Sequence, residues 1–169
     1  MFIGVLAARA AAFEHRIAAL VLNDGLYDFG GAVTRGLPPK AAELLADGRD
    51  AEAGAVMAQA AEHSPYLRWA AGNTKWTFGT PSAAEGLRKL QAYTMDGVAG
   101  QITCPTLVLD AENDQFFRGE PQRIFAALRC TKELIAFSAA EGAAEHCQSG
   151  AVLLFEQRVF DRLDALLSP

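Results

Sequence analysis

The stretch Cys104-Pro105-Thr106-Leu107-Val108-Leu109-Asp110-Ala111-Glu112-Asn113-Asp114 decides the fold class of this 169-residue chain. Pro105 introduces an apolar run at residues 106–109, and a polar, acidic segment follows it directly. A short, continuous apolar run without polar alternation is typical of a parallel strand that is covered on both faces. We therefore predict a buried strand at residues 106–109, followed by an acidic loop.

Two further apolar runs have the same character. One is Ile17-Ala18-Ala19-Leu20-Val21-Leu22, closed by the turn formers Asn23-Asp24-Gly25, and the other is Leu134-Ile135-Ala136-Phe137. We also expect an alanine-rich helix at residues 5–13, a helix between the second and third strands, and a last amphipathic helix at residues 151–167. This alternation predicts an α/β fold with a three-stranded parallel sheet and flanking helices.

A long insertion separates the first strand from the second. It reads as four helices, at residues 40–46, 51–63, 65–72 and 83–93. Ser64 before Pro65 is typical of a helix start, and Ser82 with Glu85 forms a capping box. A parallel crossover needs only one helix, so the insertion is larger than the connection requires. We therefore divide the chain into an α/β core, residues 1–29 and 102–169, and a helical cap insertion, residues 30–101.

The composition excludes several classes of function. The chain has 15 Lys plus Arg against 20 Asp plus Glu and no basic run, so we expect no nucleic-acid partner. No stretch approaches the roughly 18 apolar residues of a membrane span, so we expect no membrane partner either. Arg9 and Glu14 interrupt the apolar start, which is unlike a signal peptide. Cys104, Cys130 and Cys147 form no CxxC pair, and we predict a reduced, cytoplasmic location.

Two loops combine side chains that suit acid–base chemistry. Asp114 lies in the loop after the second predicted strand, and His146 lies in the loop after the third. In open α/β sheets, ligand chemistry takes place beyond the carboxyl ends of the strands, where these two loops meet. A carboxylate there would fix the tautomer of the imidazole and stabilise its protonated form. The two loops therefore predict an orienting acid and a base.

The residues predict neither a metal nor a cofactor. The acidic loop at residues 110–117 begins with the spacing of a calcium loop. Gln115, however, replaces the turn glycine, and Pro121 stands where the closing glutamate belongs. The pair Gly30-Gly31 lacks the spacing of a phosphate-binding fingerprint.

The stretch at residues 104–114 resembles the acid strand and acid loop of the α/β-hydrolase superfamily, and residues 142–147 are similar to its histidine loop. The nearest resemblance is to bacterial esterase-like and peptidase-like hydrolases with a helical cap before the acid strand. It implies that Asp114 is the catalytic acid and His146 the catalytic base. It also implies a Ser-His-Asp triad that hydrolyses an ester, thioester or amide of a small acyl substrate. The substrate-binding residues are not assigned.

One part of the family pattern does not occur in these residues. The nucleophile elbow, GxSxG, is missing, although Gly4-Val5-Leu6-Ala7-Ala8-Arg9 resembles the tail of an elbow and its helix. In this register the nucleophile falls at or just before Met1. We therefore expect the C-terminal part of a serine hydrolase, which is inactive by itself. The alternative is a truncated or degenerate, non-catalytic protein that acts by association. The codons upstream of Met1 discriminate between the two.

Other candidate residues receive structural roles. Cys147 adjoins His146, but neighbours in sequence rarely face one another, so we do not expect a Cys–His nucleophilic pair. His15 and His63 are predicted near helix ends, where a cation suits the helix dipole. The aromatic residues of the insertion are expected to pack inside it, namely Trp69, Trp76 and Phe78.

The resemblance also predicts an exposed sheet edge. In the superfamily, the strand at residues 17–22 pairs on its outer side with the strand that carries the nucleophile. Without that partner, its N–H and C=O groups are unpaired along an apolar run. Long apolar edges recruit partners or aggregate. We therefore expect a homo-oligomer through this edge, or poor solubility.

Overall fold

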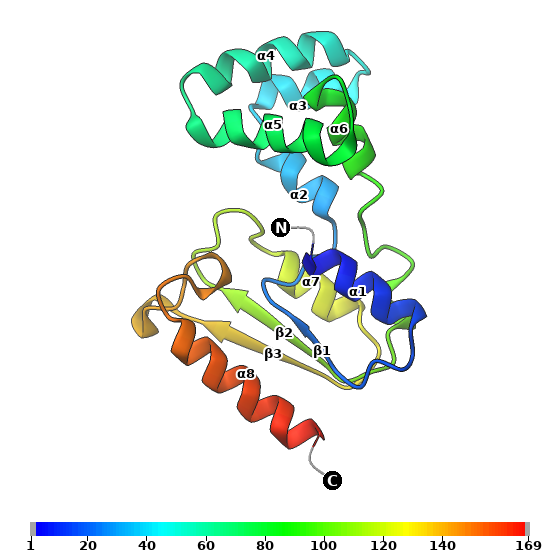
Figure 1. Ribbon diagram of the computed structural model, residues 1–169, viewed down its shortest axis with the longest axis vertical. Helices are drawn as coiled ribbons and strands as arrows, with labels where there is room; N and C mark the ends of the chain where they lie inside the picture. The colour runs from blue at the N-terminus through cyan, green and yellow to red at the C-terminus, as the bar shows by residue number, and fades with distance from the viewer. Residues whose placement is uncertain (1–2, 168–169) are drawn as a thin grey trace. The chain divides into compact units, whose positions relative to one another are not determined.

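The computed structural model describes residues 3–167 and divides into two compact units (Figure 1). The sheet unit comprises Met1–Asp28 and Thr94–Pro169, and the helical unit comprises Phe29–Tyr93. Residues 94–101, which the sequence analysis assigned to the insertion, lie in the sheet unit. The reason is local, since Met95 is fully buried there and its N–H donates to the carbonyl of Tyr27 at 2.7 Å.

The sheet unit contains the three-stranded parallel sheet that the apolar runs predict. Its strands are β1 (Leu20–Leu22), β2 (Thr106–Ala111) and β3 (Lys132–Phe137), in the order β1-β2-β3. Leu20 pairs with Thr106, and Thr106 pairs with Lys132, so the three strands start together. The middle strand β2 is buried along nearly its whole length. The predicted α/β class and the parallel sheet are confirmed.

Helices cover both faces of the sheet, as Figure 1 shows. They are α1 (Ile3–Phe13), α7 (Glu120–Ala127) and α8 (Val152–Leu167). Successive side chains of a strand point to opposite faces. Leu107, Leu109 and Phe137 pack with Val159 of α8. On the other face, α7 approaches so closely that a Cβ at Gly25 would lie 2.9 Å from the side chain of Ile124. This close approach requires the glycine in the turn after β1.

The first strand is shorter than predicted. The apolar run at residues 17–22 predicts six strand residues, but only Leu20–Leu22 pair with β2. Ladder pairing begins where the N–H of Leu20 donates to the carbonyl of Pro105 at 2.9 Å. Pro105 has no backbone N–H that could donate to a carbonyl of the first chain segment. The ladder therefore does not extend to the residues before Leu20. Residues 17–19 are apolar but none of them is buried, so the partner strand rather than the apolar composition sets the length of β1.

The helical unit contains α2 (Phe29–Arg35), α3 (Pro39–Ala46), α4 (Asp50–Glu62), α5 (Pro65–Phe78) and α6 (Ala83–Leu90). The two predicted helix starts are confirmed, because the hydroxyl of Ser64 accepts the N–H of Leu67 and that of Ser82 accepts the N–H of Glu85, each at 3.2 Å. The α5 helix continues beyond residue 72 and ends at Gly79, whose left-handed φ of 59° suits glycine. Helix α2 was not predicted.

The aromatic residues of α5 differ from the expectation. Trp69 and Trp76 are 51% and 84% exposed, so the prediction that they pack inside the unit is wrong. No residue of helix α5 is buried, and several on its inner side are only partly buried. Phe78 does pack, with its ring 5.7 Å from that of Tyr93.

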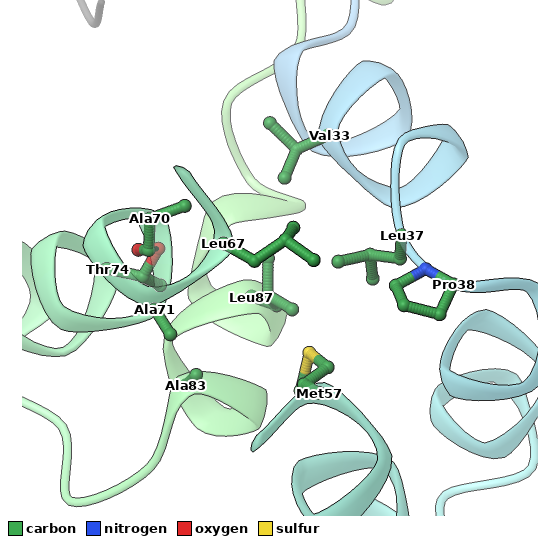
Figure 2. Close-up of a pocket in the computed structure, with 10 residues that line it drawn as sticks. All are labelled: Val33, Leu37, Pro38, Met57, Leu67, Ala70, Ala71, Thr74, Ala83 and Leu87. Carbon is green, nitrogen blue, oxygen red and sulfur yellow. Dashed lines mark hydrogen bonds between the residues drawn. The ribbon is translucent and has the colours of Figure 1, made fainter. Parts of the chain in front are cut away.

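An apolar cavity of about 50 Å³ lies inside the helical unit (Figure 2). It is lined by side chains of α2, α4, α5 and α6 and of the segment that leads into α3, among them Leu37, Met57, Leu67 and Leu87. Leu87 is only 5% exposed. The leucines around the cavity therefore contribute to the packing between these helices.

Replacing Leu87 by alanine is expected to destabilise the chain by about 2–5 kcal/mol, since the lost contacts add to a cavity that already exists. Urea unfolding followed by circular dichroism measures this change. Leu153→Ala is the matched control, because Leu153 is 82% exposed and its truncation should cost less than about 0.5 kcal/mol. Equal losses for the two variants would contradict the packing described here.

The outer side of β1 has no strand partner among residues 3–167. The backbone N–H of Leu20 points toward β2, where it donates to the carbonyl of Pro105. Because N–H groups alternate in direction along a strand, the N–H of Val21 points away from β2, to the open edge. We predict that the chain associates through this edge at micromolar concentration, as sedimentation equilibrium can measure. Val21→Pro removes the donor and should shift the chain to monomer, whereas Val21→Ala keeps the donor and should not. A wild-type chain that stays monomeric would contradict the prediction.

Of the helices in residues 3–167, none combines the length and the apolar character that crossing a bilayer requires.

Candidate active site

The acid loop holds Asp114 in a fixed position. Asp114 follows β2, and its side chain is almost completely buried. Its Oδ1 accepts the N–H groups of Phe116 at 2.7 Å and Phe117 at 3.1 Å. An aspartate that bonds the backbone two and three residues ahead closes its own loop. Its second oxygen is left to face the histidine loop.

The histidine loop brings His146 to that oxygen. Nδ1 of His146 lies 3.0 Å from Oδ2 of Asp114 in a hydrogen bond. The rings of Phe116 and Phe117 stand edge-on to the imidazole, with centroids at 5.0 and 5.5 Å. The His146 side chain keeps 29% of its surface exposed. The two residues chosen from the sequence therefore lie together, with the imidazole partly open to solvent.

A third residue, Asp24, belongs to this site and was missed. It follows β1 in the turn Asn23-Asp24-Gly25, which the sequence analysis treated only as a stop signal. Its carboxylate is buried, and its Oδ2 lies 2.8 Å from Nδ1 of His146. Its position directly after a strand could have indicated its role, since the loops that follow the three parallel strands all begin at the same edge of the sheet.

The charges of the site stabilise the protonated imidazole. The bond to Asp114, the contact with Asp24 and the Cys147 thiol together raise the pKa of His146 to about 12, although burial acts in the opposite direction. Burial acts to raise the pKa of Asp114, but its bonds to His146 and to the two phenylalanine amides outweigh this and lower that pKa. The pair is therefore an imidazolium–carboxylate ion pair at neutral pH.

A third carboxyl group lies near these two aspartates. Burial raises the pKa of Asp110, the bond from the Gln122 amide opposes this, and the charges of Asp24 and Asp114 raise it further. The carboxyl ends of the strands thus concentrate negative charge around one imidazole, which favours a cation at this place.

Cys147 differs from the expectation. Its Sγ lies 3.4 Å from Nε2 of His146, so the two neighbouring side chains do face one another. The reason is the backbone, because Cys147 adopts a left-handed φ of 53° that turns adjacent side chains toward the same side. Neighbouring side chains point apart in extended and right-handed helical backbone, but not necessarily where a residue adopts a left-handed conformation.

The other two histidines lie elsewhere. His15 contacts the hydroxyl of Thr103 at 3.2 Å, and His63 caps the C-terminus of α4. Neither contacts Asp114 or His146 among the described contacts.

Asp24, His146 and Cys147 also place possible metal ligands within 4.8 Å of one another. Asp24 faces Nδ1 of the ring, whereas Cys147 faces Nε2. Each ring nitrogen is thus engaged by a different residue, an arrangement that suits proton transfer through the imidazole.

The structure places one imidazole against two carboxylates at the carboxyl ends of a parallel sheet, and comparison with known proteins agrees with this fold. No protein-family model matches the chain. The chain is similar to the hydrolase LUC6 of a Fusarium species, with 29% identity over 170 residues, and to the hydrolase acrC of Aspergillus aculeatus, with 32% identity over 173 residues. Each match covers 95% of this chain, but only 40% and 39% of these relatives.

The structure is similar to the crystal structure of the 2,6-dihydroxy-pseudo-oxynicotine hydrolase, with a TM-score of 0.67 and 18% identity. That match covers 98% of this chain and 38% of the other. The chain has the α/β-hydrolase fold. It spans about 40% of the length of the curated relatives it matches.

Proposed function

We propose that this chain is the C-terminal part of a serine hydrolase and supplies the acid and the base of a Ser-His-Asp triad. The observation that carries the proposal is the 3.0 Å contact between Nδ1 of His146 and Oδ2 of Asp114. Named hydrolases among the relatives support the class of reaction. The serine would come from outside residues 1–169, because these contain no GxSxG elbow.

The proposed reaction is acyl transfer to water. His146 Nε2 takes the proton of the serine hydroxyl while the serine oxygen bonds to the acyl carbon. The imidazolium then gives this proton to the departing alcohol, thiol or amine. A water molecule releases the acid from the acyl-enzyme by the same two proton transfers. Asp114 stabilises the imidazolium, and backbone N–H groups would bind the oxyanion. The substrate would be a small ester, thioester or amide.

This role sets a condition on the charge of the site. A general base must lose its proton near the working pH. With both facing carboxylates charged, His146 keeps its proton at neutral pH. In a working enzyme, the segment that supplies the serine would therefore have to lower the pKa of His146. By itself the chain should be inactive, since it has no positioned serine.

The remaining parts of the proposal concern the helical unit and the location. We assign Phe29–Tyr93 to a helical cap insertion, since so many helices exceed what a crossover needs. We assign the protein to the cytoplasm, because Cys104, Cys130 and Cys147 are unpaired thiols.

The test compares this chain with the polypeptide read in frame upstream of Met1, here called the extended protein. Both are assayed on an activated ester, a thioester and an anilide. The extended protein should hydrolyse at least one of them, and the 169-residue chain should not exceed background. A stop codon directly upstream, or an extended protein without activity, would favour the non-catalytic alternative.

A further inference from the structure

The residues with a left-handed backbone gather at one place. Among the described residues, three residues other than glycine have a positive φ, namely Asp24 at 47°, Cys147 at 53° and Gln148 at 50°. Aspartate adopts this conformation comparatively readily, whereas cysteine and glutamine do so rarely and keep it only where surrounding contacts hold them. All three contribute to the contacts between the turn after β1 and the histidine loop.

Asp24 makes these contacts. Its Oδ2 accepts the N–H of Cys147, and its Oδ1 accepts the Gln148 side-chain amide at 3.3 Å. The same Oδ2 lies 2.8 Å from Nδ1 of His146. The side chain is 1% exposed, and a buried carboxylate is stable only if it is paired and hydrogen-bonded. The contacts of this carboxylate are thus with residues 146–148.

We propose that Asp24 is a second carboxylate of the acid–base pair, a positioning residue that holds the histidine loop and shares the Nδ1 side of His146 with Asp114. This inference rests on the proposed function, because positioning matters only if His146 transfers protons. It deepens that function, since the imidazole is oriented from two strands rather than one. Loss of Asp114 alone then leaves His146 with an anionic partner.

The groups that face the imidazole come from each neighbouring element. Asp24 follows β1, Asp114 follows β2, and Cys147 belongs to the histidine loop itself. Asp110 lies nearby at the end of β2, where it accepts a bond from Gln122 instead of contacting His146. An anion within a few ångströms of an imidazole typically raises its pKa by about 1–3 units. Asp24 and Asp114 should therefore have similar effects, and Asp110 a smaller one.

The test is an NMR titration of His146 in this chain with ¹⁵N-labelled histidine. Asp24→Asn removes the charge but keeps an oxygen for the Cys147 N–H, and asparagine tolerates a left-handed φ. We expect Asp24→Asn and Asp114→Asn each to lower the pKa of His146 by about 1–3 units. The double variant should show the largest decrease, toward the ordinary value of about 6.5. Asp110→Asn, the matched control, should cause a smaller shift than either.

A second variant separates charge from loop structure. Asp24→Ala should also move the amide resonance of Cys147, because it removes the acceptor as well as the charge. If Asp24→Asn shifts the pKa of His146 no more than Asp110→Asn does, the inference is wrong and Asp24 only braces the loop. These readouts need no turnover. An inactive extended protein would therefore refute the proposed function, whereas an unresponsive imidazole would refute the role of Asp24.

Discussion

Replacing His146 by alanine in the extended protein is expected to lower kcat/KM for an activated ester by at least about 10³-fold. The loss should fall on kcat, because His146 acts on protons that move only in the transition state. Asp114→Ala should also lower kcat, but less steeply, since Asp24 still lies 2.8 Å from Nδ1. Steady-state kinetics of the purified variants measure these effects.

Two variants serve as controls. His63→Ala changes a histidine at the C-terminus of α4, outside the site, and should keep the wild-type activity. Cys147→Ala removes the thiol that lies 3.4 Å from Nε2 but keeps the backbone N–H that binds Asp24. It should remain active if a serine is the nucleophile. If Cys147→Ala loses activity as strongly as His146→Ala, the nucleophile is the cysteine, and the serine mechanism is wrong.

The second large effect is on the stability of the 169-residue chain as a function of pH. The folded-state pKa of His146, about 12, lies above its ordinary value of 6.5. A group whose pKa is raised on folding stabilises the fold fully below its unfolded pKa, and this stabilisation is lost as the pH rises. The free energy of unfolding should therefore fall from about pH 6.5 upward, by at most about 1.4 kcal/mol per pH unit from this group.

Asp114 affects the stability of the fold at acidic pH, and its effect has the opposite pH dependence. Its pKa is lowered from 3.8 on folding, so its stabilisation is present above that value and is lost as the pH falls below it. The contribution of the pair should thus be largest between about pH 4 and 6.5. Urea unfolding at pH 6 and pH 9 measures the alkaline part.

His146→Gln isolates the contribution of the imidazole, because other groups titrate in the same range. The variant should show a flatter decrease of stability between pH 6 and pH 9 than the wild type. His63→Gln, the control, should follow the wild-type curve. Identical curves for His146→Gln and the wild type would show that the ion pair does not stabilise the fold.

Much of the fold could be predicted from local sequence. The apolar runs around Leu107 and Ile135 reveal strands of a parallel sheet, because such strands lack polar alternation. The burial that this pattern indicates holds for β2, whereas β3 is mostly only partly buried. Ser64 and Ser82 reveal helix starts, since their capping bonds lie within one turn. The length of β1 could not be predicted, because it depends on the ladder with β2 and on the missing N–H of Pro105. The exposure of Trp69 and Trp76 depends on which side of α5 the neighbouring helices cover.

The candidate site divides in the same way. Asp114 and His146 could be selected because each follows a strand and matches a family pattern. Asp24 also follows a strand, but it lies between Asn23 and Gly25 and was therefore interpreted only as a turn residue. The contact between Cys147 and His146 arises from a left-handed backbone that no composition pattern announces. Residue types alone therefore cannot predict contacts that depend on a rare φ value.

In the proposed mechanism, His146 and Asp114 activate a serine supplied from outside residues 1–169. Labelling of the extended protein with a fluorophosphonate, followed by mass spectrometry, identifies this serine. We expect one labelled serine, located in a G-x-S-x-G segment upstream of residue 1, and loss of this label in His146→Ala. Label on a serine within residues 1–169, or an upstream label that His146→Ala leaves unchanged, would contradict it.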